Sequence, residues 1–379
     1  MSKLQQDISG YSLACPAARF LQGALCCEEL ADGWVHPERF SKSQMRALGS
    51  CLAWHPGLYR QMARCTSGVL LSFTTDSQHI ALELLVEKPP QGTQAVLRQV
   101  PSGIQDSLVV SVDKKQTVLV PISIDNEDKT SRLSFGEPDV LRFSVEDQED
   151  TKGMLRLPGF GEVHQVRIWF PCLTGVLIRT LFGDGSFFSP VEAQKGLVVI
   201  GDSIAQGFVV GSPTQTWPTQ LARKLKLNLC NQSIGGQIFQ AETIEKPNVA
   251  WNIELVIVAL GSNYRFEKAN REQVKQDIRR TLHEVAQEYK DSRIIAITPF
   301  PHFEARYPTH PLSCFSDVED FIFEAARSEH IEVIRGADLI DANPKLFADD
   351  DHPNVHGATQ IASRLADALK EVSKTFKRF

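Results

Sequence analysis

The sequence predicts a mixed α/β protein in which an antiparallel, jelly-roll-like β-sandwich precedes a three-layer α/β/α domain with a central parallel sheet. Up to about residue 190, short apolar or alternating segments follow one another with polar turns between them, which is typical of such a sandwich. From about residue 195, apolar strands alternate with amphipathic helices, which indicates βαβ units. A length of 379 residues also favours two domains. We therefore expect domains at residues 1–190 and 195–379, with a linker in residues 187–196.

Seven segments of the first part have the length and pattern of β-strands. They are residues 68–75, 79–87, 106–113, 116–123, 140–145, 164–171 and 175–182. Polar clusters at 87–94, 125–131 and 146–153 separate several of these strands, as expected for turns. The first 65 residues are less regular, and there we expect one helix within residues 42–54.

The second part contains five buried-looking strands and three clear helical faces. The strands are residues 197–200, 227–230, 254–260, 293–298 and 331–335. The helical faces recur every three or four residues, as an amphipathic helix requires. They are formed by Trp217, Leu221 and Leu225, by Val274, Ile278, Leu282, Val285 and Tyr289, and by Ile361, Leu365, Leu369 and Val372.

The charge and hydropathy of the chain exclude several classes of partner. The formal net charge is −6 and no basic tract is present, so we expect no nucleic acid and no anionic membrane as partner. The polar start, MSKLQQDISGYSL, does not resemble a signal peptide. The longest apolar run, LVIVAL, is far shorter than the roughly 20 residues that span a bilayer. A cytoplasmic location is therefore predicted.

The cysteines are expected to be reduced and structural. None of them has the C-x-x-C spacing of a zinc site or a redox pair, and a free cysteine behaves as a small apolar residue. The eight are Cys15, Cys26, Cys27, Cys51, Cys65, Cys172, Cys230 and Cys314.

A serine follows the first strand of the second part directly. The tripeptide Gly-Asp-Ser at 201–203 comes after the apolar run 197–200, and functional groups collect at the carboxyl ends of the strands in a parallel sheet. A serine that opens a helix has its backbone N–H free to point at an anion. On its own, the tripeptide also fits a plain turn in which Ser203 caps a helix.

Two further strand ends carry hydrogen-bond donors. The segment NQSIGG at 231–236 follows the second strand, and its adjacent glycines, Gly235 and Gly236, can expose a backbone N–H as an oxyanion site requires. Asn263, in LGSN after the third strand, would place an amide donor at the same edge. Taken singly, the glycines also fit a simple loop and the asparagine a turn.

The segment ADDDHPNVHG at 348–357 precedes the last helix and offers a base. His352 can take the proton of a serine, and Asp349 can bend back to orient the imidazole. From the residues alone, Asp350 is an alternative to Asp349, and the aspartates also fit a helix cap or a metal site. His352 and His356 have no third ligand at a convincing spacing, so no metal is predicted.

Taken together, these segments resemble the four blocks of the SGNH (GDSL-type) hydrolase superfamily. The blocks G-D-S-I, N-x-x-x-G-G, G-x-N and D-x-x-H-P-N occur in the family's order, and the match covers about residues 195–375. The resemblance implies that Ser203 is the nucleophile, His352 its base and Asp349 the partner of the base. Family spacing selects Asp349 over Asp350.

The resemblance also implies an oxyanion hole, formed by the backbone N–H of Ser203, by Gly236 and by Asn263. Gly236 is preferred to Gly235 because the family's glycine lies five residues after the asparagine that Asn231 matches. Tyr264 stands where the family usually has an aspartate, a departure that concerns local geometry more than activity.

The first part looks like the β-sandwich that precedes the catalytic domain in two-domain SGNH esterases, many of which are carbohydrate acetyl esterases. The expected activity is that of a serine carboxylester hydrolase with a Ser-His-Asp triad and an acyl-enzyme. It would remove acetyl or other small acyl groups from a saccharide or another small ester, without a metal or organic cofactor.

Three alternatives to this activity stay open. Two are enzymatic, a small-acyl thioesterase and a lipid acylhydrolase, and the third is a catalytically retired carbohydrate-binding protein. The residues that bind the substrate are not predicted. His302 and His310, in the loop after a strand end, fit either surface histidines or a pocket wall.

Overall fold

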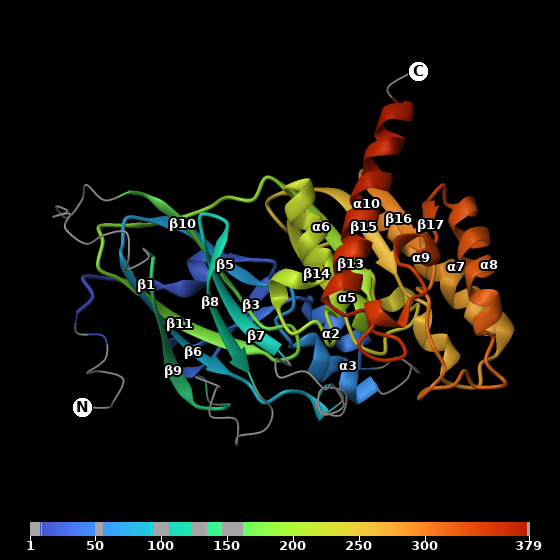
Figure 1. The fold of residues 1–379 in the computed structure, drawn as a ribbon, viewed down its shortest axis with the longest axis horizontal. Helices are drawn as coiled ribbons and strands as arrows, with labels where there is room; N and C mark the ends of the chain where they lie inside the picture. The colour runs from blue at the N-terminus through green and yellow to red at the C-terminus, as the bar shows by residue number, and fades with distance from the viewer. Residues whose placement is uncertain are drawn as a thin grey trace.

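Three β-sheets organise the chain in the computed structural model (Figure 1). The structure describes residues 8, 10–49, 56–91, 93, 106–122, 133, 135–145 and 162–376. Cys51 and the turns expected at 125–131 and 146–153 lie outside these residues. No helix within the described ranges is both long and apolar enough to cross a membrane.

Two antiparallel sheets form the first part of the chain. One sheet has the order β3-β4-β11-β6-β9, with β1 paired to β11, and the other has the order β12-β5-β10-β7-β8, with β2 paired to β5. All seven predicted strands are confirmed, whereas the four short strands before residue 40 were not predicted. The bounds are β1 Leu13–Pro16, β2 Leu21–Gln22, β3 Cys26–Glu29, β4 Val35–Glu38, β5 Leu70–Thr75, β6 His79–Val86, β7 Asp106–Val112, β8 Lys115–Ile122, β9 Pro138–Ser144, β10 His164–Trp169, β11 Val176–Gly183 and β12 Phe188–Pro190.

The two sheets enclose one apolar core, which explains the alternating pattern of their strands. Successive side chains of a strand point to opposite faces, so every second residue enters the core. Leu71 and Phe73 of β5 and Val166 and Ile168 of β10 are fully buried in it. The predicted sandwich is therefore confirmed.

A parallel sheet with the order β14-β13-β15-β16-β17 forms the second part. Every pairing in it is parallel, as the alternation of strands and helices predicted. The five predicted strands are confirmed, with the bounds β13 Lys195–Gly201, β14 Asn228–Ser233, β15 Asn252–Ala259, β16 Arg293–Ile297 and β17 Glu332–Ile334.

Helices cover both faces of the parallel sheet, which makes the three layers. Leu197 and Val199 of β13 pack toward α6 (Trp217–Leu225) and α10 (Val355–Phe376), whereas Val198 and Ile200 pack toward α7 (Arg271–Glu288) and α8 (Phe315–Ser328). A strand buried on both faces reads as a continuous apolar run. The sheets change from antiparallel to parallel between β12 and β13, inside the predicted linker, while the division into two domains stays a prediction.

Two helices from the first part lie against the parallel sheet, beside α5 (Ser203–Gln206) (Figure 1). They are α2 (Lys42–Ala47), which confirms the start of the helix expected in 42–54, and α3 (Pro56–Ala63), which was not predicted. The fully buried Arg39 fixes them there. Its guanidinium donates to the carbonyl oxygens of Met62 (3.0 Å) and Cys65 (2.5 Å) on one side. On the other side it donates to those of Asn231 (2.6 Å) and Ser233 (3.0 Å) in β14.

Candidate active site

Three neighbouring strands bring Ser203, Gly236 and Asn263 to one edge of the parallel sheet. These residues follow β13, β14 and β15, and β13 lies between the other two strands. The chain moves from β13 to β14 on one side and returns to β15 on the other, so this edge is a switch point of the topology. Such points open a crevice at the carboxyl ends of the strands, which is where the sequence predicted the site.

A tight turn presents the Ser203 hydroxyl. A Cβ atom on Gly201 would lie 2.6 Å from the Cβ of Ala205, so the chain turns there at a distance that only glycine permits. The Asp202 side chain caps the short helix α5 by accepting a hydrogen bond from the backbone N–H of Ile204 at 3.0 Å. Ser203 itself is 9% exposed and faces the crevice.

The hydroxyl lies within a chain of hydrogen bonds that begins at Asp349. His352 Nε2 is 2.8 Å from Ser203 Oγ, and His352 Nδ1 is 2.8 Å from Asp349 Oδ2. The other carboxylate oxygen of Asp349 accepts the backbone N–H groups of Asp351 (2.8 Å) and His352 (2.7 Å). A serine in this arrangement can pass its proton to the imidazole, which the carboxylate orients.

The neighbouring aspartates have other partners. Asp350 accepts the backbone N–H groups of Arg306 and of Tyr307, the latter at 2.9 Å, and so holds the loop before α8. Asp351 forms an ion pair with the fully buried Arg265, at 3.1 Å from Nη1. Of the three aspartates, therefore, Asp349 is the one that contacts the imidazole.

The electrostatics of the site follow from burial and from this pairing. Burial raises the pKa of Asp349, but the hydrogen bond and charge of His352 outweigh it and lower that pKa to about 2. Burial lowers the pKa of His352, but Asp349 outweighs it, so the pKa of the imidazole is raised above its usual value. Burial raises the pKa of Asp202 to about 7 and that of Asp351 to about 6.

Hydrogen bonds fix the glycine loop after β14 and leave the backbone N–H of Gly236 without a partner among the described residues. The N–H of Gly235 donates to Gln206 Oε1 at 2.7 Å, and the carbonyl of Gly236 accepts the Tyr59 hydroxyl at 2.6 Å. Gly236 has a φ of +80°, which favours glycine. Its own N–H has no hydrogen-bond partner among the described residues. The structure thus distinguishes Gly236 from Gly235 by the partners of their N–H groups.

Asn263 contributes a side-chain amide to the same edge. Its Nδ2 donates to the carbonyl oxygen of Gln237 at 3.0 Å, which fixes the amide plane. The second contact of Nδ2, to Asp202 Oδ2, is 3.5 Å long and therefore weak. One N–H of Asn263 thus remains available to a stronger acceptor.

A cavity of about 270 Å³ lies in front of these groups. Its wall includes Leu58 and Met62 of α3, so the first part of the chain contributes to the site. The ring of Phe208 stacks on the His352 imidazole, with centroids 5.6 Å apart. The lining residues are Leu58, Met62, Ser203, Ile204, Phe208, Gly235, Gly236, Ser262, Asn263, Phe266, Asp351 and His352.

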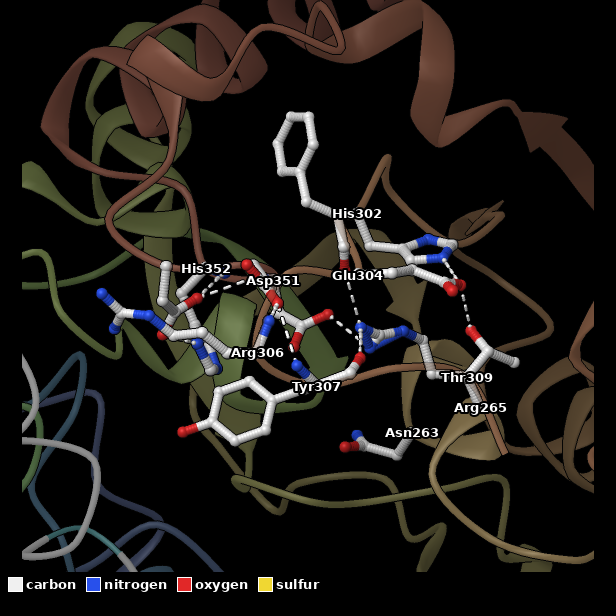
Figure 2. Close-up of polar contacts among 12 residues, drawn as sticks. Asn263, Arg265, His302, Glu304, Arg306, Tyr307, Thr309, Asp351 and His352 are labelled. Atoms are coloured by element: carbon white, nitrogen blue, oxygen red, sulfur yellow. Dashed lines mark hydrogen bonds and ion pairs between the residues drawn. The ribbon is translucent and has the colours of Figure 1, made fainter. Parts of the chain in front are cut away.

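The remaining candidates lie outside this cavity. His302 is 3.4 Å from Glu304, in the loop that Arg265 supports through the carbonyl oxygens of Phe303 and Tyr307 (Figure 2). His310 accepts the N–H of Leu312 in the same loop, and His356 is exposed on the first turn of α10. These three histidines do not contact the Ser203 hydroxyl.

Residues 199–360 match the model of the GDSL-like lipase/acylhydrolase family. Over these residues the chain is similar to the GDSL-like lipases and acylhydrolases that the model describes. The match contains all four sequence blocks, which confirms the resemblance to SGNH hydrolases. The family model thus supports an SGNH-type acylhydrolase. No curated protein sequence matches the chain.

Several solved structures share the fold of this chain along nearly its whole length. The salicylyl-acyltransferase SsfX3 from a tetracycline biosynthetic pathway has a TM-score of 0.70 at 17% identity, covering 95% of this chain and 97% of its own. A putative GDSL-like lipase from Bacteroides ovatus has a TM-score of 0.65 at 16% identity, covering 96% and 98%. A family two carbohydrate esterase from Cellvibrio japonicus has a TM-score of 0.61 at 13% identity, covering 95% and 97%. At these identities the likeness establishes the fold, including the sandwich.

Sequence reasoning missed the residues that support the site from a distance. Tyr59, Met62 and Gln206 belong to no motif, and the two residues of α3 lie far from Ser203 in the chain. The departure from the family pattern at Tyr264 did not indicate these residues. The structure accounts for it, because Tyr264 is 2% exposed and stacks parallel to Phe239 in the core.

Proposed function

We propose that the protein is a serine esterase that removes small acyl groups, above all acetyl groups, from a saccharide. Ser203 is the nucleophile, His352 the general base and Asp349 the residue that orients the base. The observation that carries the proposal is the unbroken chain of contacts from Asp349 Oδ2 through His352 to Ser203 Oγ, with both steps at 2.8 Å. This intact chain also favours an active enzyme over a retired binding protein.

In the proposed reaction, Ser203 Oγ attacks the carbonyl carbon of the ester while its proton moves to His352 Nε2. The negative charge on the carbonyl oxygen is met by the N–H groups of Ser203, Gly236 and Asn263. His352 then protonates the leaving alcohol, and the acyl group stays on Ser203. A water molecule gives its proton to His352 and attacks the acyl-enzyme, which releases the acid and restores the serine.

The size and lining of the cavity support a small acyl group. Its volume of about 270 Å³ lies below the roughly 300–1,000 Å³ of sites that take drug-sized ligands. The side chains of Leu58, Met62 and Phe208 make its wall apolar, which suits the methyl end of an acyl chain. The saccharide part of the proposal rests on the shared fold with the carbohydrate esterase from Cellvibrio japonicus.

The test is the hydrolysis of p-nitrophenyl acetate, butyrate and octanoate, and of an acetylated xylo-oligosaccharide, by the wild type and by Ser203→Ala. We expect turnover of the acetate to exceed that of the octanoate, with acetate released from the oligosaccharide. In Ser203→Ala the rate should fall by about 10⁴-fold or more, because the nucleophile is lost. Mass spectrometry of the wild type, quenched during turnover, should detect an acyl group on Ser203.

Ser328→Ala is the matched control, since Ser328 is exposed on α8 and its hydroxyl donates to a backbone carbonyl there. It should retain the wild-type rate. Activity that rises with chain length would replace the deacetylase by a lipid acylhydrolase. Equal rates in the wild type and Ser203→Ala would contradict the serine mechanism.

A further inference from the structure

A groove of about 620 Å³ lies away from the catalytic cavity, between the second antiparallel sheet and the parallel sheet. Its floor includes Leu70 of β5 and Trp169 of β10, and α6 with the start of β14 forms the opposite wall. The groove lines the amino end of β14, whereas Gly236 follows the carboxyl end. A strand of six residues is roughly 17–20 Å long, so the two sites are distinct.

Cationic side chains dominate this groove. Three of them extend from or just beyond α6, one from the turn between β7 and β8, and one from β10. They are Arg223, Lys224, Lys226, Lys114 and Arg167. The described residues that line the groove include no aspartate or glutamate. A chain with a net charge of −6 thus concentrates five positive charges in one place.

The positive charges of the two arginines in the groove repel each other. Within the described ranges, neither the Arg167 nor the Arg223 guanidinium has a hydrogen-bond or ion-pair partner. Burial, and then the charge of Arg223, lower the pKa of the half-buried Arg167. Eight other arginines of the described residues do pair with carboxylates. They are Arg64, Arg179, Arg265, Arg271, Arg280, Arg293, Arg335 and Arg364.

The favourable interaction of cations with the carboxyl end of α6 explains only part of this cluster. Arg223 and Lys224 lie in the last turn of α6, where cations interact favourably with the free carbonyl groups. Arg167 and Lys114 belong to the sandwich and gain nothing from that dipole. A half-buried guanidinium close to other cations is destabilised when no anion neutralises it.

We propose that this groove binds a multiply charged oxyanion, such as a ligand with two or more phosphate or carboxylate groups. The planar guanidinium groups of Arg167 and Arg223 match the oxygens of such groups, and the lysines add charge around them. The apolar floor of Leu70 and Trp169 strengthens the attraction by lowering the local dielectric constant. The site is independent of the esterase chemistry.

Calorimetric titration of the full chain with pyrophosphate and with tricarballylate at low ionic strength tests the proposal. We expect the wild type to bind at least one of them, and more weakly as salt is added. The double variant Arg167→Gln/Arg223→Gln should bind at least about tenfold more weakly, because two charge-assisted contacts are lost. Binding of pyrophosphate alone would show that the groove recognises phosphate groups. Equal binding of both probes would show that it recognises negative charge, whichever group carries it.

The matched control is Lys246→Gln/Lys345→Gln, which removes two exposed cations outside the groove. It should bind the anions as the wild type does. Without an anion, Arg167→Gln should raise the melting temperature by about 1–3 °C by relieving the repulsion, and it should lose the further rise that pyrophosphate gives the wild type. Failure of both probes to bind the wild type, or equal weakening in both double variants, would overturn the site.

Discussion

A single histidine links the charge of the site to its chemistry. His352 can act as a base only when it is neutral, yet Asp349 stabilises its charged form and raises its pKa. The contact that orients the imidazole therefore also moves the working range of the enzyme to higher pH. Asp349 pairs with both the ring and the backbone of its own turn, so it is ordered as well as charged.

Asp349→Asn should lower the turnover number and change its dependence on pH. In the wild type we expect the rate to rise with pH through the raised pKa of His352, above the ordinary value of about 6.5. The amide removes the negative charge that stabilises the imidazolium, so the midpoint should shift to lower pH. The turnover number should fall by about 10³–10⁴-fold, because the imidazole loses its orientation. A pH–rate profile for acetate ester hydrolysis measures both effects.

Asp350→Asn is the control for this prediction, since Asp350 lies next in the chain but contacts the loop at Arg306 and Tyr307. Its profile should keep the wild-type midpoint. A shifted midpoint in Asp350→Asn together with an unshifted one in Asp349→Asn would reverse the assignment of the two aspartates.

At the scale of elements, the sequence was sufficient to predict each strand or helix whose apolar residues repeat at a regular spacing. Strands β5 to β11 and β13 to β17 alternate or run apolar over their length, and α6, α7 and α10 keep one apolar face, so the sequence indicated them. Helix α8 also keeps such a face, at Val318, Phe321, Ile322 and Ala325, although the prediction did not include it. The short strands β1 to β4 lack any such pattern. Their places are decided by pairing with distant segments.

The residues of the candidate site likewise divide into those that the sequence predicts and those that it does not. Residues at strand ends, such as Ser203 and Asn263, can be placed from the sequence because parallel strands end at one edge. The choice of Asp349 over Asp350 needed family spacing, and the hydrogen bonds of the turn now give it a physical reason. The contact of α3 with the glycine loop left no signal, because it joins two segments that no spacing rule relates.

Tyr59→Phe tests whether α3 positions the oxyanion loop. The Tyr59 hydroxyl is fixed 2.6 Å from the carbonyl oxygen of Gly236, so its loss should let that glycine move while the apolar wall stays in place. We expect the turnover number to fall by about tenfold or more with little change in KM, because the transition state is more sensitive to small displacements than the bound substrate. Steady-state kinetics with p-nitrophenyl acetate separate the two constants.

Tyr289→Phe serves as the comparison, since Tyr289 is also fully buried and donates to a carbonyl oxygen, that of Glu245, at 3.1 Å. Both variants should lose a similar amount of stability, about 1 kcal/mol. Only Tyr59→Phe should lose turnover. Equal losses of turnover in the two would reduce Tyr59 to a purely structural residue.

At the scale of the whole molecule, buried polar contacts join the sandwich to the parallel sheet. The Ser67 hydroxyl donates to the carbonyl oxygen of Gln206 at 2.6 Å and accepts Asn231 Nδ2 at 3.0 Å. Gln206 Nε2 donates to the carbonyl oxygen of Cys172 at 3.2 Å. Because Gln206 also holds Gly235, the contacts that join the two parts are the contacts that shape the site. We therefore expect the two parts to unfold together.

Arg39 gives the sharpest test of that coupling. Its buried guanidinium donates to carbonyl oxygens in both parts of the chain, so Arg39→Met removes the donor of four buried hydrogen bonds. We expect a loss of about 3 kcal/mol or more in the free energy of unfolding, with a smaller loss in Arg39→Lys, which keeps a charge and some donors. Urea denaturation followed by tryptophan fluorescence and by far-ultraviolet circular dichroism should give coincident transitions in the wild type. Two separated transitions in the wild type, or an unchanged midpoint in Arg39→Met, would show that the parts fold independently and that the buried contacts do not couple them.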